Sequence, residues 1–179
     1  MKSSTVPGDR PLNCLQPMQY RLYTPDDFDA LYAIEESCFD PPFRFSRRQM
    51  RTLVRRSGSA VWLAEGDEGL TGFAIVEWAK RADGVSAYIQ TIEVIPQARN
   101  RGVGRELLRR IEDSALMAGA LRIRLHVDAE NQDAIRLYET HGYRCEGRKE
   151  NFYPLGRAAL IYVKALDSCV GMIDAPHQG

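Results

Sequence analysis

A glycine-rich turn at residues 99–105 is the segment of this chain whose residue types and spacing best suit the binding of an anion. It has the sequence Arg-Asn-Arg-Gly-Val-Gly-Arg and lies between the mostly apolar stretch 92–96 and a helical pattern. Gly102 and Gly104 allow a ligand to approach the backbone closely. The first N–H groups of the following helix have no acceptor within the helix, so a phosphate can accept them at the positive end of the helix dipole. The turn therefore predicts a phosphate site.

The elements that must position this turn alternate between strand patterns and helix patterns. Strands are predicted at 18–23, 60–65, 72–78, 87–95, 121–127, 144–148 and 158–166. Helices are predicted at 25–38, 47–56, from the glycine-rich turn to 118, and at 132–140, and the turn 66–69 is expected to close a hairpin. Within 121–127, apolar residues alternate with Arg122, Arg124 and His126. This period of two predicts that His126 lies opposite the apolar row formed by Leu121, Ile123, Leu125 and Val127.

The composition is that of a globular chain, with 44% hydrophobic and 27% charged residues. A length of 179 residues favours one domain, which we expect at 18–166, with a loose arm at 1–17 and a tail at 167–179. The 24 basic and 24 acidic residues leave no bulk field that would attract nucleic acid. Any anion binding must therefore be local.

Cysteine spacing and hydropathy set further bounds. The 4 cysteines are widely spaced without a Cys-x-x-Cys motif, so we expect neither a metal site nor a disulfide framework. The first residues lack the apolar core of a signal peptide, and no stretch approaches roughly 18 apolar residues. These features predict a cytoplasmic protein without a membrane partner. We further expect a monomer or weak dimer.

Two motifs, taken in order, resemble those of a known family. The motif Arg-x-x-Gly-x-Gly at 99–104 is followed by Asn-x-x-Ala-x-x-Leu-Tyr-x-x-x-Gly-aromatic at 131–143. In this order they resemble the GNAT acetyltransferases, over roughly residues 20–166. The resemblance implies an α/β GNAT fold with a mixed, mostly antiparallel central sheet and helices on both faces. It also implies a parallel strand pair that splays apart to admit the pantetheine arm of acetyl-coenzyme A.

The resemblance further implies which residues hold acetyl-coenzyme A as a co-substrate, with no metal. The backbone of Ile92, Glu93 and Val94 would pair with the pantetheine amides, and the glycine-rich turn would surround the pyrophosphate. Asn131 and Tyr138 would complete the cofactor side. The turn residues concerned are Arg99, Asn100, Arg101, Gly102, Val103, Gly104 and Arg105.

Within the superfamily, the chain is similar to N-terminal protein acetyltransferases, including the type that modifies a ribosomal-protein alanine. The likeness lies in segment 34–39 before a Pro-aromatic loop, and in Asn-Phe-Tyr-Pro at 151–154. Because the corresponding segments line the peptide groove in these relatives, the resemblance implies that the partner is a protein or peptide N-terminus, such as that of a ribosomal protein. Substrate contacts are expected at Phe39, Phe43, Phe152 and Tyr153.

The same likeness implies a proton relay through water. Tyr-Ile-Gln-Thr at 88–91 and Leu-His-Val at 125–127 match relatives in which a tyrosine and a histidine bind the deprotonating water. The ribosomal-alanine type instead carries a glutamate at the position of His126. Tyr88 and His126 would relay the amine proton, and Tyr138 would protonate the departing thiolate.

Two further groups belong to this expected site. The backbone N–H of Val94 would hold the oxyanion, and Glu93 is a competing base. Five positions separate Glu93 from Tyr88, so the two side chains should face opposite sides of a regular strand. Only a β-bulge between them would relax that exclusion.

The expected reaction is direct acetyl transfer to a protein N-terminal α-amine in a ternary complex. An α-amino group with a pKa of about 7.7 is roughly one-sixth neutral at pH 7, whereas a lysine near 10.4 needs about 3.7 kcal/mol more to reach that state. A weak, water-mediated base therefore suits the α-amine. Transfer to a small-molecule amine or a lysine, and a non-catalytic acyl-coenzyme A binding module, are the alternatives.

Overall fold

The computed structural model describes residues 17–82 and 84–166, so most of the arm at 1–17 and the tail at 167–179 lie outside the described residues. A seven-stranded sheet has the strand order β1-β2-β3-β4-β5-β7-β6. Its strands are β1 Gln19–Leu22, β2 Ser59–Gly66, β3 Gly69–Arg81, β4 Gly84–Val94, β5 Ala120–Asp128, β6 Arg144–Lys149 and β7 Ala159–Ala165. The helices are α1 Phe28–Cys38, α2 Arg47–Val54, α3 Val103–Met117 and α4 Gln132–Thr140, with short 3-10 turns at Pro25–Asp27, Pro96–Ala98 and Pro154–Gly156.

The sheet is mixed, as predicted. Strands β4 and β5 pair in parallel, and the neighbouring strands pair antiparallel. A parallel connection needs a crossover, which α3 supplies between β4 and β5. The predicted α/β fold with a mixed, mostly antiparallel sheet is therefore confirmed.

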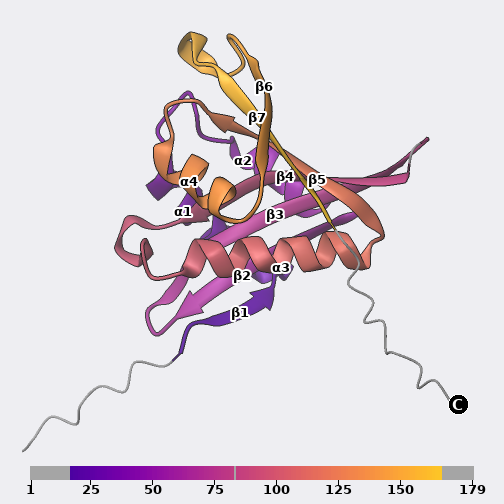
Figure 1. The fold of residues 1–179 in the computed structure, drawn as a ribbon. Coiled ribbons are helices and arrows are strands. Elements are labelled where there is room, and N and C mark those ends of the chain that lie inside the picture. Colours follow the sequence, from indigo (N-terminus) through magenta and orange to yellow (C-terminus); the bar gives the residue numbers. More distant parts are fainter. Residues whose placement is uncertain (1–16, 83, 167–179) are drawn as a thin grey trace, which may run out of the picture.

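Helices cover both faces of the sheet (Figure 1). Helix α3 lies across β2 to β5 on one face, while α1 and α2 contact β2, β3 and β4. Alternation along β3 supplies both cores, because Ala74 and Val76 join the cluster under α3, whereas Phe73 and Ile75 join the cluster under α1.

The hairpin between β3 and β4 is longer than predicted. Its strands were expected to end at Trp78 and to resume at Ala87, but pairing continues out to Arg81 opposite Gly84. Hydrogen bonds between strands join backbone groups, so they do not require apolar side chains. The polar residues at the tip of this hairpin can therefore pair although they bury no apolar face. Figure 1 shows the hairpin projecting from the sheet.

Two smaller differences concern α2 and β5. Helix α2 ends at Val54 rather than at residue 56. Leu121, expected in the apolar row of β5, is 59% exposed, and Ala120 is buried instead. The reason is a register shift, in which Ala120 opposes Val85 and Arg122 opposes Ser86, leaving Leu121 as the extra residue. No helix among the described residues is long and apolar enough to span a membrane.

Candidate functional site

A wedge opens between β4 and β5 at their carboxyl ends. The two strands pair from Val85 to Tyr88 on β4, yet β4 continues to Val94 and β5 to Asp128. The predicted splay of the parallel pair is therefore confirmed. Ile95 donates its N–H to the Thr71 carbonyl at 2.9 Å. Because successive N–H groups of a strand point to opposite edges, the Val94 N–H points into the wedge.

A β-bulge lies within β4 at Gln90. Thr91 opposes Ile75 and Ile89 opposes Val76, so Gln90 is the extra residue. Beyond the bulge the face alternation is reversed, and Glu93 opposes Phe73 on the α1 side. Tyr88 and Glu93 were expected to face opposite sides of a regular strand, and this bulge is the exception that was expected to relax the exclusion. Both lie on the α1 side.

His126 and Tyr88 are in direct contact on this face. The Tyr88 hydroxyl lies 2.9 Å from His126 Nδ1. The His126 ring stacks on Phe152, with ring centroids 4.4 Å apart and planes within 5° of parallel. Tyr153 donates its hydroxyl to the His126 carbonyl at 3.2 Å. The structure thus brings these sequence-predicted residues, from β4, β5 and the segment before β7, into one cluster.

The electrostatic surroundings keep His126 neutral. Partial burial, followed by the positive charges of Arg124 and Lys149, lowers the pKa of its imidazole below the ordinary value. In the tautomer that carries its proton on Nδ1, the ring donates to Tyr88 and leaves Nε2 as an acceptor. Burial raises the Tyr88 pKa, so Tyr88 keeps its proton. The pair is suited to accept a proton from bound water.

Tyr138 projects from α4 toward the same cluster. It is 6% exposed, and burial raises its pKa, with smaller effects from the nearby hydroxyls of Tyr153 and Tyr88. Its ring packs edge-on against Tyr143, with centroids 5.4 Å apart. Tyr138 therefore stays protonated at neutral pH and can donate a proton to a developing anion.

Glu93 is held in a different environment, paired with Glu35 of α1. Both are buried, at 3% and 0% exposure. Glu93 Oε1 accepts from the Thr91 hydroxyl at 2.8 Å, and Glu35 Oε1 accepts from the Phe45 N–H at 2.6 Å. Burial, and then the neighbouring Glu35, raise the pKa of Glu93 well above its ordinary value. The two carboxyl groups therefore share a proton, since two adjacent buried carboxylates cannot both ionise.

Sequence reasoning missed Glu35. Its signal was available, because Leu31, Ile34, Glu35 and Cys38 occupy successive positions of one helical stripe. An acid on an otherwise apolar stripe is buried with its helix and needs a partner. Here the partner is Glu93, and the Phe45 N–H ties the pair to the loop at 39–46.

The glycine-rich turn has the geometry of an anion site. Gly102 precedes α3 with a φ of 81°, and a Cβ at this position would meet nothing within 4 Å. The first helical hydrogen bond is donated by the Glu106 N–H to the Gly102 carbonyl, which leaves the N–H groups at 103–105 free of helical acceptors. Arg101 and Arg105 are exposed beside them. These features fit the pyrophosphate of a coenzyme A thioester.

Other predicted cofactor residues make contacts that stabilise the turn and α4. Arg99 donates from Nε to the Val94 carbonyl at 2.9 Å and so folds the turn back onto β4. The Val103 side chain is buried in the core, so only its backbone faces the turn. Asn131 caps α4 by accepting the Ala134 N–H at 3.1 Å. Asn100 adopts a φ of 59°, which the reversal of the turn requires.

The expected peptide groove is bounded by two loops. Phe39 and Phe152 are each 36% exposed. Phe43, in the loop after α1, lies beneath the Arg157 guanidinium at 5.0 Å, which joins this loop to the segment before β7. The four predicted substrate residues, Tyr153 included, therefore lie on loops that flank the His126 cluster, and their contact with substrate remains a prediction.

Comparison with known proteins identifies the family. The model of the Acetyltransferase (GNAT) family matches residues 28–143. The chain belongs to this family. The match spans the fold from α1 through the Asn131 motif, so the predicted membership is confirmed.

Individual relatives are named for different acceptors. The chain is 33% identical over 88 residues to the [ribosomal protein bS18]-alanine N-acetyltransferase of Salmonella typhimurium, covering 49% of this chain and 57% of that protein. It is 35% identical over 85 residues to the mycothiol acetyltransferase of Beutenbergia cavernae, covering 48% and 28%. The chain spans between 28% and 65% of the length of such curated relatives.

A solved structure adds a further likeness. Arabidopsis thaliana NAA60 in complex with a bisubstrate analogue matches with a TM-score of 0.72 and 25% identity, over 83% of this chain and 98% of that chain. The likeness therefore extends over most of this chain and nearly all of the other.

Proposed function

We propose that this chain transfers an acetyl group from acetyl-coenzyme A to the N-terminal α-amine of a polypeptide, directly and in a ternary complex. The observation that carries the proposal is the 2.9 Å contact between Tyr88 and His126 at the mouth of the β4–β5 wedge. This pair can take a proton from an amine through water, and it lies beside exposed aromatic side chains that suit a peptide.

The residues present fit a coenzyme A thioester. The free N–H groups at the start of α3 and the exposed Arg101 and Arg105 would bind its pyrophosphate. The backbone of Ile92, Glu93 and Val94 would bind the pantetheine arm along the wedge. When bound, the thioester supplies an activated acetyl carbonyl, and the Val94 N–H is directed to stabilise negative charge on its oxygen.

The protons follow a short path through this chain's own groups. His126 accepts the ammonium proton through a water that Tyr88 also contacts, which leaves the amine nitrogen with a free electron pair. The nitrogen attacks the acetyl carbonyl, and the carbon–sulfur bond breaks. Tyr138, held protonated by burial, donates a proton to the departing thiolate. The reaction needs no covalent acyl-enzyme and no metal.

Glu93 is the weaker choice for the base. Although it shares a face with Tyr88, it is 3% exposed and shares its proton with Glu35. Because burial, and then Glu35, raise the pKa of Glu93 well above its ordinary value, Glu93 is the member of the pair that holds the proton, so it has no charged oxygen to accept one from the amine. We therefore assign Glu93 and Glu35 to holding α1 and its loop against β4.

A thiol-release screen tests the proposal. The purified chain is incubated with acetyl-coenzyme A and peptides varied at their first two residues, including the N-terminus of ribosomal protein bS18, for which a relative is named. Polyamines, free amino acids and N-terminally blocked lysine peptides are the controls. Thiol release with free N-termini supports the proposal. Release with small amines alone, or coenzyme A binding without any release, overturns it.

A further inference from the structure

A basic trough leads away from the His126 cluster across the open part of the sheet. It is a cavity of about 1370 Å³ that is lined by residues of β3 to β7 and of the segment after α2. We define the trough by its basic side chains, which come from the segment after α2 and from β3, β5, β6 and β7. They are Arg56, Arg81, Arg122, Arg124, Arg144, Lys149 and Lys164, of which Lys164 pairs with Glu112.

Strand register places these side chains in line with the site. Tyr88 opposes Arg124 on β5, Arg124 opposes Val163 on β7, and Val163 opposes Arg144 on β6. Directly opposed residues share one face of a sheet. Arg124 and Arg144 therefore lie on the face of Tyr88, with Arg144 two strands, or about 10 Å, from Arg124.

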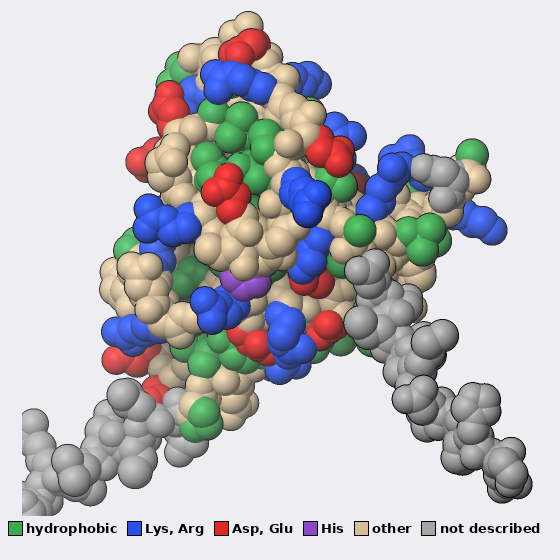
Figure 2. All heavy atoms as spheres, in the orientation of Figure 1, with side chains coloured by type: hydrophobic (Ala, Val, Ile, Leu, Met, Phe, Trp, Pro, Cys, Tyr) green, Lys and Arg blue, Asp and Glu red, His purple; other side chains and the backbone are tan. Residues whose placement is uncertain are grey.

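The charge in the trough is unbalanced, although the chain as a whole is neutral. On the face that carries α3, basic and acidic side chains are intermixed (Figure 2), as in the ion pairs of Arg109 with Glu106 and Asp113. Among the lining residues of the trough the acids are Glu77 and Glu146. Arg56 already pairs with Glu77.

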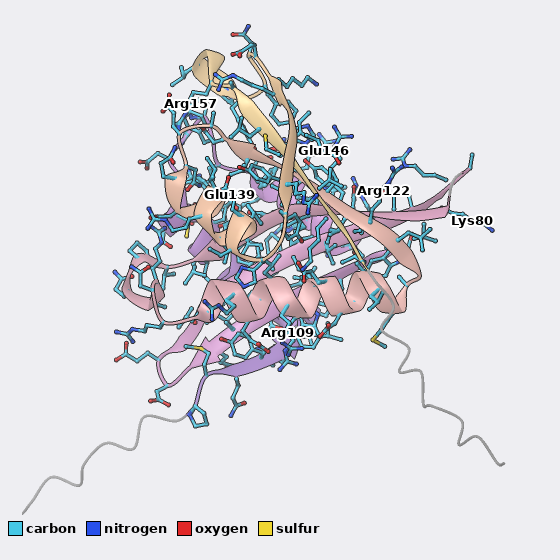
Figure 3. The ribbon with its side chains drawn as sticks, viewed as in Figure 1. Lys80, Arg109, Arg122, Glu139, Glu146 and Arg157 are labelled. Atoms are coloured by element: carbon cyan, nitrogen blue, oxygen red, sulfur yellow. The ribbon has the colours of Figure 1, made fainter. Side chains whose placement is uncertain are left out.

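Three basic groups of the trough, Arg81, Arg124 and Arg144, are open to a ligand. Across residues 17–82 and 84–166, no ion pair is formed by Arg81, Arg124 or Arg144. In Figure 3, Arg122 on β5 and Glu146 on β6 lie toward the side from which the hairpin with Lys80 projects. The positive charge of Arg124 and Lys149 reaches the site itself, since both lower the His126 pKa.

We propose that the basic trough binds acidic residues of the acceptor polypeptide, downstream of the N-terminus that is acetylated. This inference rests on the proposed function and adds a substrate class to it. An extended peptide advances about 3.3 Å per residue. Arg124 lies two residues before His126 on one face of β5, so an acceptor amine at His126 would place roughly its third to fifth residues beside the basic groups.

The experiment compares peptides that differ only in charge. Each peptide keeps the same first two residues, and carries at positions three to five either Asp and Glu or the neutral Asn and Gln. The enzymes are the wild type, Arg144→Glu and the matched control Arg148→Glu. Arg148 lies on the same strand but opposes Leu160, which packs toward the α3 core, so its side chain is on the other face. The readout is the ratio of kcat/KM for acidic over neutral peptide, at low and high salt.

We expect the wild type to favour the acidic peptide by about tenfold at low salt, because an exposed ion pair is worth up to about fivefold and more than one is formed. The preference should appear in KM and should weaken as salt screens it. Arg144→Glu should remove most of it, whereas Arg148→Glu should keep it. Equal use of the two peptides by the wild type, or equal losses in the two variants, overturns the inference even when peptides are good substrates.

Binding provides a second readout that does not depend on turnover. A fluorescent acidic peptide is titrated with each protein and followed by anisotropy, with single-stranded RNA of similar length as a competitor. Saturable peptide binding that Arg144→Glu weakens supports the trough as an acidic-peptide site. If RNA binds and the peptide does not, the trough is a nucleic-acid surface and the inference fails. If the acidic peptide binds but no peptide is ever acetylated, the proposed function fails instead.

Discussion

Replacing His126 by Gln should slow acetylation and also change how the rate depends on pH. His126 contacts Tyr88 at 2.9 Å and is the neutral acceptor of the cluster. Gln keeps a hydrogen-bonding side chain near Tyr88 but accepts no proton at neutral pH. Loss of a general base costs about 10²- to 10⁴-fold, so we expect kcat/KM at pH 7 to fall by at least about 10²-fold.

The pH profile distinguishes a lost base from a disturbed pocket. Without the base, the variant can acetylate only amine that is already neutral in solution. With an amine pKa of about 7.7, the neutral fraction rises from roughly one-sixth at pH 7 to about 95% at pH 9. The rate of the variant should therefore rise about sixfold over this range. The wild type should stay flat there and lose activity only below the lowered pKa of His126, where the imidazole becomes charged.

Initial rates of thiol release with one peptide, between pH 5 and 9, provide the measurement. His141→Gln is the matched control, because His141 lies at the end of α4 with its Nδ1 2.6 Å from the Leu137 carbonyl, away from the cluster. The control should follow the wild-type profile. Wild-type rates in the His126 variant, or a profile parallel to that of the wild type, would refute the assignment of the base.

Two further substitutions test the carboxyl pair and the glycine-rich turn. The raised pKa of Glu93 means that the native state keeps a proton that the unfolded chain loses above about pH 4.5, so stability falls as pH rises. Glu93→Gln should therefore be more stable than the wild type at pH 8 but not at pH 4, as urea unfolding at both values will measure, and an equal effect at both would contradict the shared proton. At Gly104, an added Cβ would meet Leu137 Cδ2 at an ordinary 3.7 Å, and Ala favours a helix by about 0.5–1 kcal/mol. Gly104→Ala should thus raise Tm yet weaken coenzyme A binding in calorimetry, and unchanged affinity would argue against pyrophosphate at this turn.

Much of the fold was predictable because its signals are local. Alternation along β5 was sufficient to predict that His126 faces away from Ile123 and Leu125, and the structure buries both of these apolar residues. Ser46 directly precedes α2, and serine is favoured at this position because its hydroxyl can accept a backbone N–H, here that of Gln49. Such features depend on residues within one or two turns of each other, so a single sequence carries them.

The parts that were not predictable depend on contacts between distant segments. The projecting end of the β3–β4 hairpin is stabilised by hydrogen bonds between backbone groups. Its side chains are polar and show no apolar alternation, so the sequence gives no signal for the strands there. The pairing of Glu35 with Glu93 joins residues from α1 and β4, and neither segment alone shows the partner. The line of Arg124 and Arg144 depends on the register of β5, β7 and β6, which is set by tertiary pairing.

The bulge at Gln90 connects these observations, because one extra residue changes the face of every residue after it. Ile92 and Val94 turn toward the α3 core, which leaves Glu93 on the α1 side against Glu35. Without the bulge, Glu93 would point into the core under α3, where no Glu35 could share its proton. The bulge also lies just beyond Tyr88, where β4 parts from β5. The same local irregularity therefore lies where the wedge begins and places Glu93 beside Glu35, and in the proposed function this leaves His126 as the base for the acceptor amine.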